Sequence, residues 1–276
     1  AFTPFAERYC DAKRGPFGWD VSGKSNMGEM RVLMQNHMVR RLKRDVLRDL
    51  PPKRREAVLM PMTAGEVSAL APSFTALDKI CQKIDSGAED SKLDFERKRL
   101  ISTLFHETGN VKQRAVREVL GALLPNLEKV IIFGHHVAML DCIEALCEKL
   151  ELGFIRIDGS TPQKERPQIV KSFKKAEKKV AILSLGACGT GLNFTMCSHV
   201  IFTELLWNPG ELLQAEDRTH RIGQTADSVF IQYLIAQGSL DDRVWAALGR
   251  KFSTLSDIFG DGPGGFDCEL LGLGNI

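Results

Sequence analysis

Residues 128–157 read EKVIIFGHHVAMLDCIEALCEKLELGFIRI, and this stretch decides the fold. The run from Lys129 to Phe133 is short and apolar, as in a buried strand, and the run from Phe154 to Ile157 is of the same kind. Between them, apolar residues from Met139 to Leu150 recur at the spacing of one face of a helix. A strand, a helix and a second strand in succession are typical of a parallel sheet that helices cover on both faces.

The same alternation continues toward the C-terminus. It predicts strands at 180–185, 199–205 and 229–236, and helices at 162–175, at 210–222 and from 240 onward. Pro167 is expected to kink the helix that begins at Pro162. We therefore predict an α/β fold with a parallel sheet over residues 126–260.

The residues outside this alternation divide into three further parts. Residues 1–60 include a helical pattern from about Gly28 to Leu50 with a basic face, which Pro51 and Pro52 stop. Residues 61–125 are mostly helical from a capping box at Thr63 and Glu66. Residues 261–276 contain five glycines and are expected to form a loose tail.

The composition argues for a globular chain that binds no metal and lies outside the membrane. The 276 residues carry 37 Lys and Arg against 35 Asp and Glu, a net charge of +2, but residues 1–60 hold 13 basic side chains against 7 acidic ones. The seven cysteines include no C-x-x-C pair, which argues against a zinc site. The longest stretch without a charged residue, Val180 to Thr203, is interrupted by three glycines and Asn193, so we expect no membrane span.

One match to a phosphate-binding loop is rejected on physical grounds. Gly18 to Ser25 fits the pattern G-x-x-x-x-G-K-[ST], but such a loop must follow a buried strand and present free backbone amides to phosphate. The residues before Gly18 cannot form a core strand, and Asp20 would place a carboxylate beside the phosphates. Lys24 is therefore not expected to bind nucleotide.

The strongest chemical signal is the segment from Gln214 to Gln224, QAEDRTHRIGQ. On the predicted helix Gln214, Arg218 and Arg221 fall at i, i+4 and i+7, which places all three on one face. Two neighbouring guanidiniums repel each other, and an anion such as phosphate would relieve the conflict by accepting their paired hydrogen bonds. The alternative is that the arginines form ion pairs with Glu216 or Asp217.

A second site is expected where the strands end, because α/β sheets bind ligands at the carboxyl ends of their strands. Gly159, Ser160 and Thr161 follow a strand and precede Pro162 at the predicted start of a helix. Free amides, a hydroxyl and the positive end of a helix suit a backbone phosphate of DNA. The alternative is that Ser160 or Thr161 only caps that helix.

The segment from Gln214 to Gln224 resembles motif VI of the Swi/Snf-type superfamily-two DNA translocases, and further motifs follow in the order of that family. Val130 to Phe133 is similar to motif IV, Ser184 to Asn193 to motif V and Trp207 to Pro209 to motif Va. Phe133 to His136, Thr203 to Trp207 and Arg8 to Lys13 narrow the resemblance to the annealing-helicase branch. The resemblance covers nearly the whole chain except the last 15 or so residues.

The resemblance implies a RecA-like motor of two lobes with ATP and Mg²⁺ in the cleft between them. Residues 1–60 would then be the end of the first lobe and a basic brace helix, 61–125 a helical protrusion and 126–260 the second, C-terminal lobe. The Walker A loop and the D-E-x-H box, which bind most of the nucleotide and its Mg²⁺, belong to the first lobe, so this chain alone is expected to be inactive. The family packs the brace between its lobes, although direct DNA contact by Arg40 to Arg55 stays an alternative.

The resemblance also implies roles for individual residues. Arg218 and Arg221 would be the catalytic arginine fingers that reach the γ-phosphate, and Gln214 would orient the nucleotide or one of the arginines. Gly189 and Gly191 would let the backbone approach the nucleotide and DNA. The expected DNA-binding residues are His136, Gly159, Ser160, Thr161, Ser184, Trp207 and Asn208, with Trp207 as a core anchor in the alternative interpretation; no metal ligand is expected.

The resemblance predicts an ATP-dependent annealing helicase that rewinds or remodels branched DNA at stalled replication forks in the nucleus. Its expected partners are branched or duplex DNA, the first lobe of the same protein and a single-stranded-DNA-binding protein that contacts regions outside this chain. A nucleosome remodeller shares every motif and stays an alternative, which preferential nucleosome sliding would favour. A dinucleotide oxidoreductase, suggested by Gly186-x-x-Gly189-x-Gly191, is disfavoured because the glycine spacing and the late position of the loop are wrong.

Overall fold

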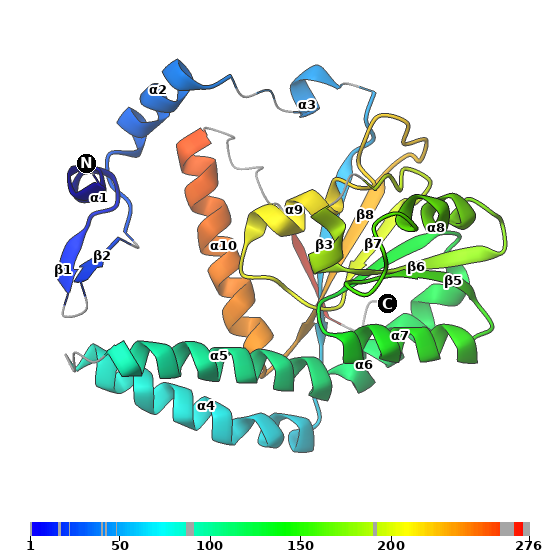
Figure 1. Ribbon diagram of the computed structural model, residues 1–276, viewed down its shortest axis with the longest axis horizontal. Coiled ribbons are helices and arrows are strands. Elements are labelled where there is room, and N and C mark those ends of the chain that lie inside the picture. The colour runs from blue at the N-terminus through cyan, green and yellow to red at the C-terminus, as the bar shows by residue number, and fades with distance from the viewer. Residues whose placement is uncertain are drawn as a thin grey trace.

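The computed structural model describes residues 2–15, 18–21, 23–39, 41, 43–47, 49–86, 91–189, 192–259 and 268–272. At its centre is a sheet whose seven described strands are all parallel and lie in the order β5-β6-β4-β7-β8-β3-β9 (Figure 1). These strands are β3 (Lys53–Met60), β4 (Val130–Gly134), β5 (Gly153–Ile157), β6 (Lys178–Ser184), β7 (His199–Phe202), β8 (Val229–Ala236) and β9 (Glu269–Gly272). The predicted parallel α/β fold is therefore confirmed.

Helices cover both faces of the sheet (Figure 1). α6 (Gln113–Leu123) and α7 (Val137–Lys149) pack on one face, and α8 (Arg166–Phe173), α9 (Pro209–Glu216) and α10 (Leu240–Phe259) pack on the other. In β4, Val130 and Ile132 pack into the core beneath α6 and α7, and Ile131 and Phe133 pack into the core beneath α8, α9 and α10. Because both faces are buried, the central strands are continuously apolar instead of alternating.

Apart from β3, α6 and short connections, the elements before β4 form an arm and a small N-terminal unit. The arm consists of two helices that lie side by side, α4 (Ala64–Asp85) and α5 (Ser91–Val111), and it begins with the predicted capping box of Thr63 and Glu66 (Figure 1). The N-terminal unit, which lies apart from the sheet, contains α1 (Phe2–Tyr9), β1 (Lys13–Gly15), β2 (Gly18–Asp20) and α2 (Met27–His37). The short elements α3 (Lys43–Val46), η1 (Leu124–Asn126) and η2 (Leu185–Gly189) lie in connections.

Two segments differ from the sequence predictions. The basic helix expected to run to Leu50 is replaced by α2, which ends at His37, and by the four residues of α3. The basic residues that follow begin strand β3, which pairs with β8 from Lys53 opposite Val229 to Met60 opposite Ala236. Residues 269–272, expected in a loose tail, form β9 against β3. Neither strand was predicted, because charged residues begin β3 and glycines surround β9.

A buried ion pair joins the end of the arm to α10. Lys112 Nζ lies 2.8 Å from Asp241 Oδ2, and both side chains are 1% exposed. The same carboxylate oxygen accepts the backbone N–H of Ala236 at 3.1 Å. Because an ion removed from water needs its partner, this pair stabilises the fold only while it is intact.

We expect Asp241→Asn to lower the free energy of unfolding by about 3 kcal/mol, because it leaves the Lys112 ammonium buried without a counter-charge. Denaturant unfolding at pH 7 measures the change. Asp78→Asn is the matched control: it breaks the exposed pair between Asp78 and Arg243, 3.0 Å apart, and should cost less than about 1 kcal/mol. Equal effects of the two variants would contradict the role given to the buried pair.

Candidate functional site

The segment that carries the two candidate arginines is mostly a turn and not a helix. α9 begins after its cap residue Asn208 and ends at Glu216, so Gln214 lies on the helix but Arg218 and Arg221 follow its end. The prediction that all three share one helical face is therefore wrong. The physical reason lies in Thr219, whose hydroxyl and N–H donate to the Glu216 carbonyl at 2.8 and 3.2 Å and turn the chain away from the helix axis. We call residues 218–224 the arginine loop.

The arginine loop lies at the amino ends of the strands. His220 Nε2 donates to the carbonyl of Pro51, just before β3, at 2.9 Å, and Gln224 Nε2 donates to the carbonyl of Cys197, just before β7, at 2.8 Å. The arginine loop therefore lies at the edge of the sheet opposite to the candidate residues that follow the strands. α9 starts beyond the carboxyl end of β7 and runs back across the sheet, which returns the chain to the opposite edge.

A buried carboxylate anchors the start of the arginine loop. Arg55 donates from Nε and Nη2 to the two oxygens of Glu216, both at 2.7 Å. Lys53 Nζ and the Tyr233 hydroxyl add hydrogen bonds of 2.9 and 2.6 Å. Burial alone would raise the pKa of Glu216, but the charge of Lys53 and the hydrogen bonds from Arg55 and Tyr233 outweigh it and lower the pKa to about 2. Burial and the adjacent carboxylate raise the pKa of Tyr233 well above its usual value.

The next carboxylate also binds cations from the N-terminal segment. Asp217 lies 2.8 Å from Lys43 Nζ and 3.1 Å from Lys53 Nζ, and Lys43 also donates to the His220 carbonyl at 2.9 Å. Burial lowers the pKa of the His220 ring and outweighs the hydrogen bond to Pro51, which would raise it. The acidic residues that the sequence offered as partners of the arginines are thus held by Lys43, Lys53 and Arg55.

The two arginines differ in their surroundings. Arg218 is 6% exposed, and its carbonyl accepts the N–H of Phe194 at 3.0 Å. Arg221 is half-buried, and its Nε donates to the Asp217 carbonyl at 2.8 Å. Within the described residues, the terminal nitrogens of Arg221 donate no hydrogen bond, so they are available to an anion. Gln214 is exposed on α9.

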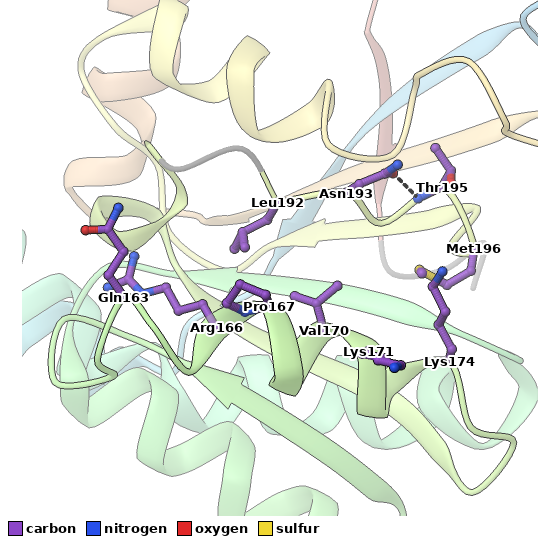
Figure 2. A pocket seen from close by; sticks show the side chains of 10 residues that line it. All are labelled: Gln163, Arg166, Pro167, Val170, Lys171, Lys174, Leu192, Asn193, Thr195 and Met196. Carbon is purple, nitrogen blue, oxygen red and sulfur yellow. Dashed lines mark hydrogen bonds between the residues drawn. The ribbon is translucent and has the colours of Figure 1, made fainter.

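The segment after β6 connects the two edges of the sheet. Ser184 ends β6, Gly189 ends the turn η2, and Gly191 lies outside the described residues. The chain then reaches the arginine loop through the hydrogen bond from Phe194. A pocket of about 610 Å³ lies between this segment and α8, as Figure 2 shows. Its lining comprises Gln163, Arg166, Pro167, Val170, Lys171, Lys174, Leu192, Asn193, Thr195 and Met196.

At the carboxyl end of β5 the chain forms a tight turn that its own side chains stabilise. Asp158 Oδ1 accepts the Ser160 N–H at 2.9 Å and the Ser160 hydroxyl at 2.6 Å, and Thr161 Oγ1 accepts the Asp158 N–H at 3.1 Å. The two hydrogen bonds from Ser160, with help from Arg156, lower the pKa of Asp158. Gly159 and Ser160 are exposed, so the turn presents its backbone to the surface.

The helix after this turn begins later than predicted. α8 starts at Arg166 instead of Pro162, so neither Ser160 nor Thr161 caps it, and the positive end of the helix is not next to them. Pro167 lies in the first turn of α8, where its missing N–H needs no partner, and the predicted kink is absent. Arg166 instead donates to the carbonyls of Thr161 and Ala187 at 3.1 and 2.9 Å and so fixes the turn against η2.

The arm covers the part of the carboxyl edge of the sheet where β4 and β7 end. His136 Nδ1 lies 2.5 Å from Glu204 Oε1, and Glu204 Oε2 accepts the N–H groups of His135 and His136 at 2.6 and 2.9 Å. Phe105 of α5 packs against both histidine rings. A Cβ at Gly109 would lie 2.7 Å from the Glu204 carboxylate, so only glycine lets α5 come this close. A buried carboxylate therefore occupies the amides at the start of α7, which does not favour a DNA phosphate at His136.

The remaining candidates follow β7. Asn208 is exposed and caps α9, because its side chain accepts the Gly210 N–H at 3.0 Å. Trp207 is half-buried and packs against the core, and its carbonyl accepts a hydrogen bond from Lys251 at 2.5 Å. This contact fits the alternative interpretation of Trp207 as a core anchor.

The rejected phosphate-loop match has the wrong local structure. Gly18, Trp19 and Asp20 form strand β2, which pairs antiparallel with β1. A Cβ at Gly23 would lie 2.7 Å from the Cys10 carbonyl, so this glycine packs against its own N-terminal unit. Three residues of the match are therefore strand and not a phosphate-binding loop.

Sequence reasoning missed the residues that position the site. Lys53 and Arg55 were read as part of a basic helix, although their i, i+2 spacing before an apolar run is that of one face of a strand. Arg166 gave no distinguishing signal, because its partners are backbone carbonyls. No sequence pattern marked Gly109 either, since its role depends on how closely α5 approaches Glu204.

Comparisons with known proteins identify relatives of the chain. Residues 111–223 match the family described as helicase conserved C-terminal domain. The chain is 44% identical over 254 residues to the DNA annealing helicase and endonuclease ZRANB3 of Mus musculus, which covers 90% of this chain and 23% of that protein. It is 40% identical over 260 residues to the SWI/SNF-related matrix-associated actin-dependent regulator of chromatin subfamily A-like protein 1 of Xenopus tropicalis, which covers 92% of this chain and 26% of that protein. The chain thus spans about a quarter of the length of these relatives.

A solved structure supports the fold. The C-terminal part of the Fun30 ATPase domain matches with a TM-score of 0.58 and 20% identity, over 72% of this chain and 90% of that one. No helix among the described residues is long and apolar enough to cross a membrane. In the same part of the chain, no cluster of three His, Cys, Asp or Glu side chains is arranged to hold a metal ion.

The low pKa of Glu216 has a consequence for acid stability. A carboxyl group with a lower pKa in the folded chain stabilises the fold above its unfolded pKa, and this contribution is lost as the pH falls from about 4.5 toward 2. Between pH 6 and pH 3, we expect the free energy of unfolding of the wild type to fall by about 2 kcal/mol more than that of Glu216→Gln. Denaturant unfolding at each pH measures the difference. Glu211→Gln, an exposed change on the same helix, should follow the wild type, and parallel curves for all three would refute the assignment.

Proposed function

We propose that this chain belongs to the Swi/Snf-type annealing helicases and is the second lobe of an ATP-dependent DNA translocase. The match of residues 111–223 to the helicase conserved C-terminal domain and the identity to two relatives support this proposal. The activity of the whole protein would be to rewind or remodel branched DNA at stalled replication forks. The mouse relative, a DNA annealing helicase that is 44% identical over 90% of this chain, supports the annealing activity, and the action at forks is part of the proposal.

The observation that carries the proposal is the arginine loop. Arg218 and Arg221 follow two carboxylates that cations of the N-terminal segment already bind, so the local acidic charge does not hold the guanidinium of Arg221. A half-buried guanidinium whose terminal nitrogens donate no hydrogen bond in the described structure suits a phosphate oxygen. We assign Arg221 and Arg218 as the arginine fingers of ATP hydrolysis.

The donor set fits ATP as an anionic ligand of this loop. The fingers would meet the γ-phosphate, where developing charge is stabilised in the transition state. Gly189, Gly191 and Gln214 stay proposed nucleotide contacts from the neighbouring segments. Hydrolysis of bound ATP supplies the free energy for movement along DNA, and the first lobe would hold most of the nucleotide and its Mg²⁺.

DNA would bind at the open half of the carboxyl edge. α5 covers the ends of β4, β7 and β8, whereas the turn after β5 is exposed at Gly159 and Ser160. Backbone and hydroxyl groups of this turn are suited to a DNA phosphate, which fixes position without reading sequence. Ser184 and Asn208 stay proposed contacts, with branched or duplex DNA as the partner and the nucleus as the location.

We expect Arg221→Ala and Arg218→Ala each to lower the DNA-stimulated kcat for ATP by about a thousandfold, because each removes charge stabilisation from the transition state. Both lobes must be present, so the measurement uses the protein in which this chain is joined to its first lobe. DNA affinity, measured in parallel, should change by less than about twofold.

Arg117→Ala is the control for these variants, because Arg117 is exposed on α6 and should leave kcat unchanged. If instead the arginine variants lose DNA binding while the bound complex still hydrolyses ATP normally, the two residues belong to the DNA interface and the assignment is wrong.

We expect Ser160→Asp to raise the Kd for branched DNA about tenfold, because it places a carboxylate in the turn proposed to meet a phosphate. Fluorescence anisotropy at one fixed salt concentration measures the change. Ser68→Asp, an exposed substitution on α4, controls for the added charge. Equal affinity of the two variants would remove the β5 turn from the DNA interface.

A further inference from the structure

The arginine loop is held by contacts from one N-terminal segment that lies more than 160 residues away in the sequence. We call Lys43, Pro51, Lys53 and Arg55 the clasp. Together they bind the carboxylates of Glu216 and Asp217, the ring of His220 and the His220 carbonyl. The clasp therefore contacts three of the five residues from Glu216 to His220, through side chain or backbone.

The contacts of the clasp differ in depth. The side chains of Lys53 and Arg55 are 14% and 11% exposed, and they face a carboxylate that is fully buried. Lys43 and Asp217 are 38% and 35% exposed, so solvent weakens their attraction. The inner contacts thus fix the position of the last residue of α9 against β3, and the outer contact lies on the loop that follows.

The clasp neutralises two carboxylates that lie next to the arginines in the sequence. Glu216 and Asp217 directly precede Arg218, and the Asp217 carbonyl accepts the hydrogen bond from Arg221 Nε. A carboxylate that lost its cations so close to the loop would attract a guanidinium away from any phosphate. Lys53 prevents this for both carboxylates, because its ammonium bridges Glu216 and Asp217 at 2.9 and 3.1 Å.

We propose that the clasp positions the arginine loop for ATP hydrolysis, so that the seating of the N-terminal segment sets kcat. Lys43, Lys53 and Arg55 act as positioning residues, through Glu216 and Asp217, and none of them contacts the nucleotide. The clasp follows α2 and the small N-terminal unit, which lies apart from the sheet (Figure 1). A displacement of that unit would therefore shift Lys43 and Lys53, and through their carboxylate partners it would shift Arg218 and Arg221. The inference rests on the proposed role of Arg218 and Arg221.

A double-mutant cycle tests the proposal in the protein that contains both lobes. Lys53→Met should lower the DNA-stimulated kcat about tenfold while KM for ATP changes less than about twofold, because the fingers act in the transition state. Lys53→Arg keeps the bridging charge and should restore kcat. Arg221→Lys keeps charge but loses the planar fork, and once it is present, adding Lys53→Met should cost less than about twofold more.

Two further variants separate positioning from general destabilisation. Lys43→Met removes an exposed contact without opening a buried site, so it should fold and still lower kcat by several-fold. Asp241→Asn, at the opposite end of β8, should destabilise the fold yet keep the wild-type kcat at a temperature where it is folded.

The outcomes distinguish this inference from the proposed function. If Arg221→Lys leaves kcat unchanged, the finger assignment itself is wrong. If Arg221→Lys lowers kcat but the effects of Lys53→Met and Arg221→Lys multiply, or if Lys53→Met and Lys43→Met both keep the wild-type kcat, the fingers stand and the clasp is merely structural.

Discussion

The arrangement of the amino edge of the sheet depends on one buried carboxylate, that of Glu216. Transferring a carboxylate from water into the protein interior costs several kcal/mol, and the cost is offset only when charges and hydrogen-bond donors surround it. Here Lys53, Arg55 and Tyr233 provide four hydrogen bonds, and they come from two neighbouring strands. The end of α9 is therefore fixed relative to β3 and β8. Because the arginine loop directly follows α9, its position is fixed as well.

The two edges of the sheet carry different segments because helices run back across it. α9 carries the chain from the carboxyl edge to the amino edge, where the arginine loop meets the starts of β3 and β7. α5 takes up half of the carboxyl edge, and its close approach to Glu204 requires the absence of a side chain at Gly109. The turn after β5, which Asp158 and Arg166 stabilise, is left at the surface.

The charge asymmetry of the chain has a structural explanation in part. The basic excess of the first 60 residues left open whether this segment packs or contacts DNA. Lys43, Lys53 and Arg55 point inward to Glu216 and Asp217, and Arg54 lies over the ring of Phe230 at 5.7 Å. A cluster of like charges in the sequence is therefore a set of partners for acidic residues far along the chain.

The sequence by itself determined the parallel sheet, because strands buried on both faces are continuously apolar and the intervening helices keep their own period, as in residues 128–157. It also singled out Arg218 and Arg221 as candidate anion-binding residues, and that role stays a prediction. Only the tertiary structure decided that α9 ends before these arginines, that β3 belongs to the sheet and that α5 covers His136. Each of these depends on contacts between residues far apart in sequence, such as Glu216 with Arg55, which no local pattern encodes.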